Sequence, residues 1–177
     1  MSAGTFTLAD LAIRERTGRP SAWARLRERE GARRAMMSTR SRDSLVTDSA
    51  AAGSTWGCGR RLDNGEICWH DGESYEPILV AARRAGKATG VVTTARVTHA
   101  TPASFYANVP NRNMESEIAR QMLERGVDVA LGGGAAFVTP ELLARHPDVH
   151  AVRTTEELFA AGERGGRLVG VFSDRHM

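Results

Sequence analysis

The stretch that decides the fold is residues 114–134, MESEIARQMLERGVDVALGGG. Its first half places Ile118 and Met122 four positions apart, which gives a helix an apolar face, and Gly126 follows as a helix stop. Small and β-branched residues over 127–131 then predict a buried strand that runs into three glycines. A helix, a glycine and a buried strand in direct succession indicate an α/β architecture.

The same alternation continues on both sides of this stretch. Further helices are predicted over 77–85, ending at Gly86, and over 140–145 and 155–161, with strands over 90–94, 149–152 and 168–172. Strands that alternate with helices form a largely parallel sheet. We therefore expect an α/β fold with a largely parallel sheet.

The first 42 residues differ from the rest by being basic, with ten Arg against four acidic residues. Helices are predicted over 7–13 and from Ser21, a plausible N-cap, after a break at 17–21. The whole chain has a net charge of +3 and only one Lys, Lys87. Acidic residues interleave with the Arg, and aromatic residues for base stacking are few, so a solvated surface is favoured over a nucleic-acid-binding arm.

The sequence contains no apolar run of membrane-spanning length and no signal peptide. Its two cysteines, Cys58 and Cys68, flank Asp63-Asn64-Gly65, a strong turn signal. A hairpin there could bring the thiols together. A disulfide and two unpaired thiols both remain open.

Two stretches carry the candidate chemistry. Residues 46–59, VTDSAAAGSTWGCG, place Asp48-Ser49 before a run of small residues, which indicates that backbone or a bound group comes very close. Residues 95–113, ARVTHATPASFYANVPNRN, form a long polar connection of the kind that is usually functional, and contain His99, Thr101 and Arg112. The three glycines at 132–134 indicate a tight strand exit more than a phosphate loop.

Several motifs occur in one order: VTDSAA, then GVVTTARVTHATPA, then NRN, then VDVALGGG. In this order and spacing the chain resembles the alkaline phosphatase family over residues 1–177. The resemblance implies an incomplete three-layer α/β/α sandwich with a largely parallel central sheet, in which residues 1–177 form one partial domain. The resemblance implies a phosphomonoesterase in which Ser49, at the start of a helix, is the nucleophile and becomes a phosphoserine. Zinc and magnesium are the cofactors that it implies, and a broad set of phosphate monoesters is the substrate class.

The resemblance also implies a role for each matching residue. Arg112 matches the arginine that clamps two phosphate oxygens, Thr101 matches a magnesium ligand, and the Ser49 oxygen meets a zinc ion. Asp48 is expected to orient the turn, and His99 to lie behind the magnesium site. Three other histidines fall outside the motifs and are expected on the surface: His70, His146 and His150.

The resemblance leaves most metal ligands unmatched. Residues 1–4 look like the continuation of a metal-binding Asp-Gly-Met motif, and residues 171–177 look like the segment that precedes the remaining ligands. We therefore expect the nucleophile and phosphate-clamp half of the domain, impaired when alone, with a non-catalytic phosphate-binding or interaction fragment as the alternative. A homodimer, or association with a missing C-terminal part, and a periplasmic or secreted location are implied by the resemblance alone.

Overall fold

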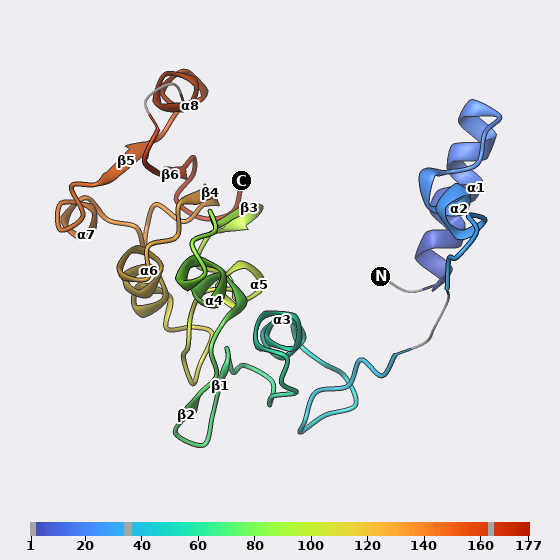
Figure 1. The fold of residues 1–177 in the computed structure, drawn as a ribbon, viewed down its shortest axis with the longest axis horizontal. Coiled ribbons are helices and arrows are strands. Elements are labelled where there is room, and N and C mark those ends of the chain that lie inside the picture. The colour runs from blue at the N-terminus through green and yellow to red at the C-terminus, as the bar shows by residue number, and fades with distance from the viewer. Residues whose placement is uncertain (1–2, 34–36, 163–164) are drawn as a thin grey trace. The chain divides into compact units, whose positions relative to one another are not determined.

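The computed structural model of the protein describes residues 3–33, 37–162 and 165–177. The chain divides into two compact units, Met1–Ser38 and Thr39–Met177. The second unit contains a parallel sheet with flanking helices, so the predicted α/β fold with a parallel sheet is confirmed (Figure 1). None of the described helices has the length and apolarity needed to cross a membrane.

The first unit is a helical pair, as the sequence predicts. Helix α1 covers Ala3–Thr17 and α2 covers Ala22–Arg27. The hydroxyl of Ser21 accepts a hydrogen bond from the Ala24 N–H at 3.1 Å, which makes Ser21 the expected N-cap of α2. Asp10 accepts from the Ser21 N–H at 2.7 Å, and the rings of Phe6 and Trp23 meet edge to face, so local contacts join the two helices.

The sheet of the second unit has the order β3-β4-β6-β5, and every neighbouring pair is parallel. Its strands are β3 (Gly90–Arg96), β4 (Val129–Gly133), β5 (Val149–Val152) and β6 (Arg167–Val171). These bounds lie within two residues of the sequence-based ones at each end. In the described chain β3 and β5 are the outer strands.

The helices of this unit are α3 (Ser49–Cys58), α4 (Ile78–Arg84), α5 (Ala100–Ala103), α6 (Glu115–Glu124), α7 (Pro140–Leu143) and α8 (Thr155–Gly162). A two-stranded hairpin pairs β1 (Trp69–His70) with β2 (Glu73–Ser74). The 95–113 connection is partly helical, because it contains α5.

The hairpin of β1 and β2 turns at Asp71-Gly72. This turn lies beyond Cys68, whereas the sequence suggested a hairpin between Cys58 and Cys68.

The core of this unit forms around α6 and the loop after β3. Ile118 and Met122, the residues that gave the sequence its helical period, are both fully buried. Tyr106 is also fully buried, and its hydroxyl donates to the Val97 carbonyl at 2.7 Å, which satisfies the polar end of the side chain. The amphipathic pattern over 114–125 therefore predicted the buried face correctly.

The small residues of α3 allow close packing against α5. A Cβ added at Gly57 would lie 1.9 Å from the Ser104 carbonyl oxygen, and one at Gly53 would lie 2.6 Å from the Ser104 hydroxyl. Because these positions are four apart, they lie on one face of the helix. Backbone itself therefore makes the close approach that the run of small residues indicated.

The three glycines after β4 also pack against the chain itself. A Cβ at Gly133 would lie 1.8 Å from the Arg175 carbonyl oxygen, and the Gly134 N–H donates to the Ser173 carbonyl at 2.9 Å. The tight strand exit that the sequence favoured is thus what the structure contains.

Candidate active site

Ser49 is the first residue of α3, and Asp48 is the N-cap. The Oδ1 atom of Asp48 accepts hydrogen bonds from the N–H groups of Ala50 and Ala51, at 3.0 and 2.8 Å. These bonds satisfy two of the N–H groups that a helix leaves free at its start. The cap fixes the backbone on both sides of Ser49, and the helix dipole adds partial positive charge beside its hydroxyl.

A turn at residues 63–66 holds Asp48 from the other side. The Asn64 side chain accepts from the Asp48 N–H at 2.8 Å and donates to the Val46 carbonyl at 2.9 Å. The Gly65 N–H donates to Oδ2 of Asp48 at 3.1 Å. The Asp-Asn-Gly signal is thus a real turn, and its bonds position the residue that caps α3.

Arg112 is the side chain that completes this group. Its Nη1 donates to Oγ of Ser49 at 2.8 Å and to Oδ2 of Asp48 at 3.0 Å. Its backbone N–H donates to the Gly65 carbonyl at 2.8 Å, so the same turn holds both Asp48 and Arg112. A cation 63 residues away in sequence therefore meets the Ser49 hydroxyl directly.

His99 lies on the far side of the Arg112 guanidinium. Its Nε2 is 3.0 Å from Nη2 of Arg112. Because a guanidinium only donates, Nε2 must accept, and the proton of the neutral ring belongs on Nδ1. Burial and the positive charge of Arg112 lower the pKa of His99, which favours this neutral form.

An ion pair that the sequence did not single out supports the loop after β3. Arg96 donates to both carboxylate oxygens of Glu115, each at 2.7 Å, and Thr98 donates to the same carboxylate at 2.6 Å. Arg96 also lies 2.7 Å from the ring of His176. Only the position of Glu115 at the first turn of a predicted helix hinted at this role.

Thr101 is the candidate that forms no hydrogen bond with this group in the described part of the chain. It is an exposed residue of α5 and lines a cavity of about 240 Å³ together with Val92, Pro102 and Phe105. Among the described residues, no hydrogen bond joins Thr101 to Ser49 or Arg112. The structure therefore brings together Ser49, Asp48, His99 and Arg112, while Thr101 stays a prediction.

The cysteines and the remaining histidines were the other open points of the sequence. Cys58 and Cys68 are free thiols, so the structure contains two unpaired thiols and not a disulfide. The Cys58 thiol donates to the Ser54 carbonyl at 3.2 Å, and the Cys68 thiol donates to the Ser104 carbonyl at 3.1 Å. The expectation that His70 is a surface residue is wrong, because only 12% of its side chain is exposed. His150 is exposed as expected, whereas His146 is half-buried.

The residues around Ser49 do not amount to a metal cage. Both oxygens of Asp48 are already bonded to N–H groups and Arg112, and Ser49 and Thr101 offer one hydroxyl each. A zinc site needs three or four ligands in tetrahedral placement. In the described part of the chain, no group of three His, Cys, Asp or Glu side chains surrounds Ser49. These residues alone therefore do not fit a zinc ion at the serine.

Comparison with known proteins gives one consistent result. A sequence model of the family described as Alkaline phosphatase matches residues 2–176. An alkaline phosphatase of Schizosaccharomyces pombe is 44% identical over 109 residues, which are 58% of this chain and 20% of that protein. Streptomycin-6-phosphate phosphatase of Streptomyces griseus is 40% identical over 112 residues, which are 62% of this chain and 24% of that protein.

Solved structures agree. The crystal structure of Thermus thermophilus alkaline phosphatase superposes with a TM-score of 0.89 at 42% identity, covering 100% of this chain and 39% of that one. Alkaline phosphatase from the Antarctic bacterium TAB5 gives 0.73 at 32% identity, covering 80% and 44%. The chain thus spans about a fifth to a quarter of these curated relatives and less than half of these solved ones.

Proposed function

Because the chain belongs to the alkaline phosphatase family, we propose that Ser49 is the nucleophile of a phosphate monoester hydrolase and that Arg112 binds the phosphoryl group. One observation carries this proposal: the Arg112 guanidinium donates to the Ser49 hydroxyl at 2.8 Å, at the N-terminus of a ten-residue helix. A positive fork beside a hydroxyl at a helix start suits a dianionic phosphate ester.

The proposed reaction has two steps. The Ser49 oxygen attacks phosphorus, the ester P–O bond breaks, and the alcohol leaves with a proton while phosphoserine forms. Water then attacks the phosphoserine, which releases phosphate and restores the hydroxyl. Arg112 holds the charge that develops on the phosphoryl oxygens, and neutral His99 keeps the guanidinium aimed by accepting from Nη2.

No side chain in the described part of the chain is placed to activate the Ser49 hydroxyl. Its hydroxyl accepts from Arg112, and in the described residues no carboxylate or imidazole accepts its proton. A serine hydroxyl needs a base or a metal to become a good nucleophile. We propose zinc and magnesium as the cofactors, with Ser49 and Thr101 as the ligands that this chain would supply. A TAB5 variant with a histidine replaced by glutamate has Mg bound in its M3 site.

We expect little turnover from the 177 residues alone, because the described residues do not assemble zinc ligands around the serine. The second candidate is a non-catalytic phosphate-binding or interaction fragment. It is favoured by the same lack of zinc ligands around Ser49 in the described residues. Under both, Ser49 and Arg112 form the anion site. A broad range of monoesters, a homodimer or association with a C-terminal part, and a periplasmic or secreted location belong to this proposal as well.

A chimera tests the proposal. In the Thermus thermophilus relative, the segment that this chain matches is replaced by residues 1–177, and hydrolysis of p-nitrophenyl phosphate is measured with zinc and magnesium. We expect activity in the chimera and its loss with Ser49→Ala, with the same melting temperature for both. A folded chimera that stays active with Ser49→Ala would overturn the role of Ser49. A folded chimera without activity, whose phosphate binding still depends on Arg112, would support the non-catalytic candidate.

A further inference from the structure

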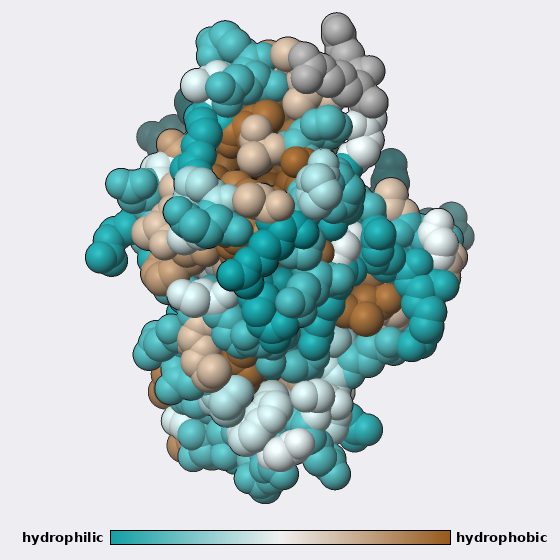
Figure 2. Space-filling model, turned by 90° about the vertical axis from the view of Figure 1, so that its left-hand side faces the viewer, coloured by the Kyte–Doolittle hydropathy of each residue, from teal (hydrophilic) through white to brown (hydrophobic). Residues whose placement is uncertain are grey.

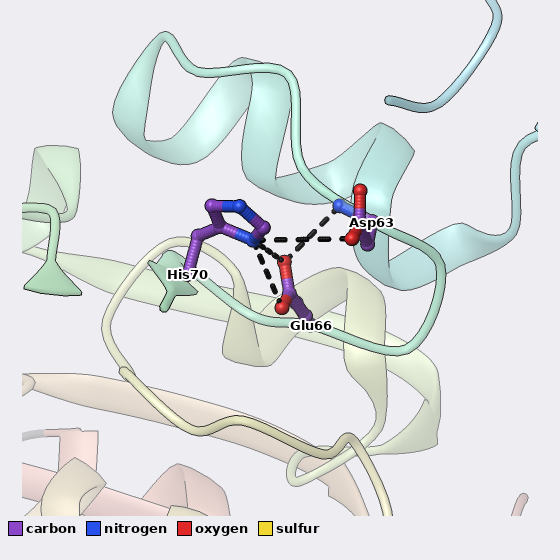
Figure 3. A group of neighbouring side chains, drawn as sticks. All are labelled: Asp63, Glu66 and His70. Carbon is purple, nitrogen blue, oxygen red and sulfur yellow. Dashed lines mark hydrogen bonds and ion pairs between the residues drawn. The ribbon is translucent and has the colours of Figure 1, made fainter. Parts of the chain in front are cut away.

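A second group of ligand-type side chains lies on the turn that holds Asp48 and Arg112 and on strand β1, which follows it. It consists of Asp63, Glu66 and His70, here called the 63–70 cluster, whose ligand atoms all lie within 4.8 Å of one another (Figure 3). Nδ1 of His70 is 2.9 Å from Oε2 of Glu66 and 4.0 Å from Oδ2 of Asp63. None of these residues belongs to the motifs that carry the family resemblance.

The histidine in this cluster has an unsatisfied atom. Nε2 of His70 is buried and forms no hydrogen bond, although Oδ2 of Asp71 lies 3.0 Å from it. If the neutral ring keeps its proton on Nδ1 to bond Glu66, Nε2 presents a lone pair to a carboxylate. If the ring instead binds a cation through Nδ1, the proton moves to Nε2 and faces Asp71. A metal-binding histidine usually donates its other N–H to such a carboxylate.

Charge and burial favour a cation at the same point. The side chains of Glu66 and His70 are only 13% and 12% exposed, and that of Asp63 is 29% exposed. Of the described guanidinium groups, only Arg42 comes within ion-pair distance of these carboxylates, at 3.4 Å from Asp63. Two half-buried carboxylates next to a third on Asp71 therefore share little compensating charge, which a divalent ion would supply.

We propose that the 63–70 cluster binds a zinc ion through Nδ1 of His70 and one carboxylate oxygen each from Glu66 and Asp63, with water as the fourth ligand. Ligands of a tetrahedral zinc lie about 3.3 Å apart, and the separations of Nδ1 from the two carboxylates bracket that value. Imidazole with carboxylates suits zinc, whereas magnesium prefers oxygen ligands alone. The site stands independently of whether Ser49 is a nucleophile.

The consequence reaches the anion site through the backbone. Asn64 and Gly65, between two of the ligands, hold Asp48, and the Gly65 carbonyl accepts from Arg112. Zinc bound to residues 63 and 66 would restrain this turn without touching Ser49. The bound zinc would therefore hold in place the residues that position Ser49 and Arg112.

Zinc alone is the probe for the test. The metal-stripped chain is titrated with zinc by calorimetry, and tetrahedral coordination is checked by the visible absorption of a cobalt(II) substitute. We expect one tight equivalent in the wild type and more than 100-fold weaker binding in His70→Gln. Asp71→Asn should weaken binding by about 10- to 100-fold, because it removes the partner of the outer N–H. Backbone exchange at Gly65 should slow when zinc is added.

Two control variants make the outcome decisive. His150→Gln changes an exposed histidine outside the cluster and should bind zinc like the wild type. Ser49→Ala combined with Thr101→Val removes the hydroxyls expected at the family's metals and should also leave this equivalent in place. No tight zinc in the wild type, equal binding by a folded His70→Gln, or loss of binding in the Ser49/Thr101 variant would each overturn the proposal.

Discussion

At the scale of single residues, the site depends on one guanidinium that makes several bonds. Arg112 contacts the Ser49 hydroxyl, the Asp48 carboxylate and the His99 ring. Its side chain is only 24% exposed, so these bonds form with little competing water. A planar fork with several donors in fixed directions can serve three partners at once, which a lysine ammonium cannot do with the same geometry.

Replacement of Arg112 should therefore weaken the binding of inorganic phosphate. We expect Arg112→Ala to raise the dissociation constant about 10- to 100-fold, since hydrogen bonds to charged groups contribute about 1.5–3 kcal/mol each. Arg112→Lys should recover only part of this loss. Phosphate titration followed by ³¹P NMR measures both, with Arg153→Ala as an exposed control on another loop. Equal phosphate affinity of the wild type, Arg112→Ala and Arg112→Lys would exclude Arg112 as the phosphate ligand.

At the scale of elements, the decisive contact is between α3 and α5. It depends on Gly57, where a Cβ would lie 1.9 Å from a backbone oxygen that cannot move without shifting α5. Ala50 and Ala51, which follow Ser49 in α3, are both buried, and the Ser104 hydroxyl donates to the Ala50 carbonyl at 3.4 Å. The position of the serine is thus coupled to how closely the two helices pack.

Gly57→Ala should destabilise the protein, because overpacking a tight contact costs about 1–3 kcal/mol. Gly162→Ala is the matched control, since that helical glycine has nothing within 4 Å of an added Cβ. The control should be neutral or stabilising by up to about 1 kcal/mol. Urea unfolding measures both changes. Equal stability of the two variants would mean that α3 is not held closely against α5.

The junction of β3 with α6 should depend on pH. Burial acts to raise the pKa of Glu115, but hydrogen bonds from Arg96 and Thr98 outweigh it, so the pKa lies below the ordinary 4.5. A lowered carboxyl pKa contributes stability that is present above the unfolded pKa and is lost as the pH falls through the folded pKa. Acidification below about pH 4.5 should therefore weaken this junction.

Glu115→Gln isolates that contribution. The melting temperature of the wild type should exceed that of the variant above about pH 5, and the difference should shrink as the pH falls below about 4. Glu156→Gln changes an exposed carboxylate for which the described structure has no hydrogen bond or ion pair, and serves as the control. A constant difference between wild type and Glu115→Gln across this range would show that the ionised carboxylate adds nothing.

At the scale of the whole chain, the described part of the second unit exposes several large apolar side chains. Val92 on the outer strand β3 is 75% exposed, and Phe159 on α8 is equally exposed. Apolar side chains gather in the upper half of the face in Figure 2, at the height where Figure 1 places α8, β5 and β6. Uncovered edges and apolar patches promote pairing between chains.

We therefore expect the 177-residue chain to self-associate in solution, with an apparent mass by light scattering that rises with concentration. Val92→Lys should reduce this association, because a charge on an edge strand opposes pairing. Ala144→Lys adds the same charge at an exposed position away from β3 and should change it less. A wild type that stays a monodisperse monomer with a sharp cooperative melt would contradict the expectation.

The sequence by itself determined the elements and named the residues that we propose carry the chemistry. The 3.6-residue period of 118 and 122, the glycine stops and the β-branched runs placed the helices and strands, since these signals are local. The motifs likewise named Ser49 and Arg112. Only the tertiary structure decided which residues meet: Arg112 with Ser49, Arg96 with Glu115, and Asn64 with Asp48. Such contacts depend on chain segments that pack together from far apart, and no local pattern encodes them.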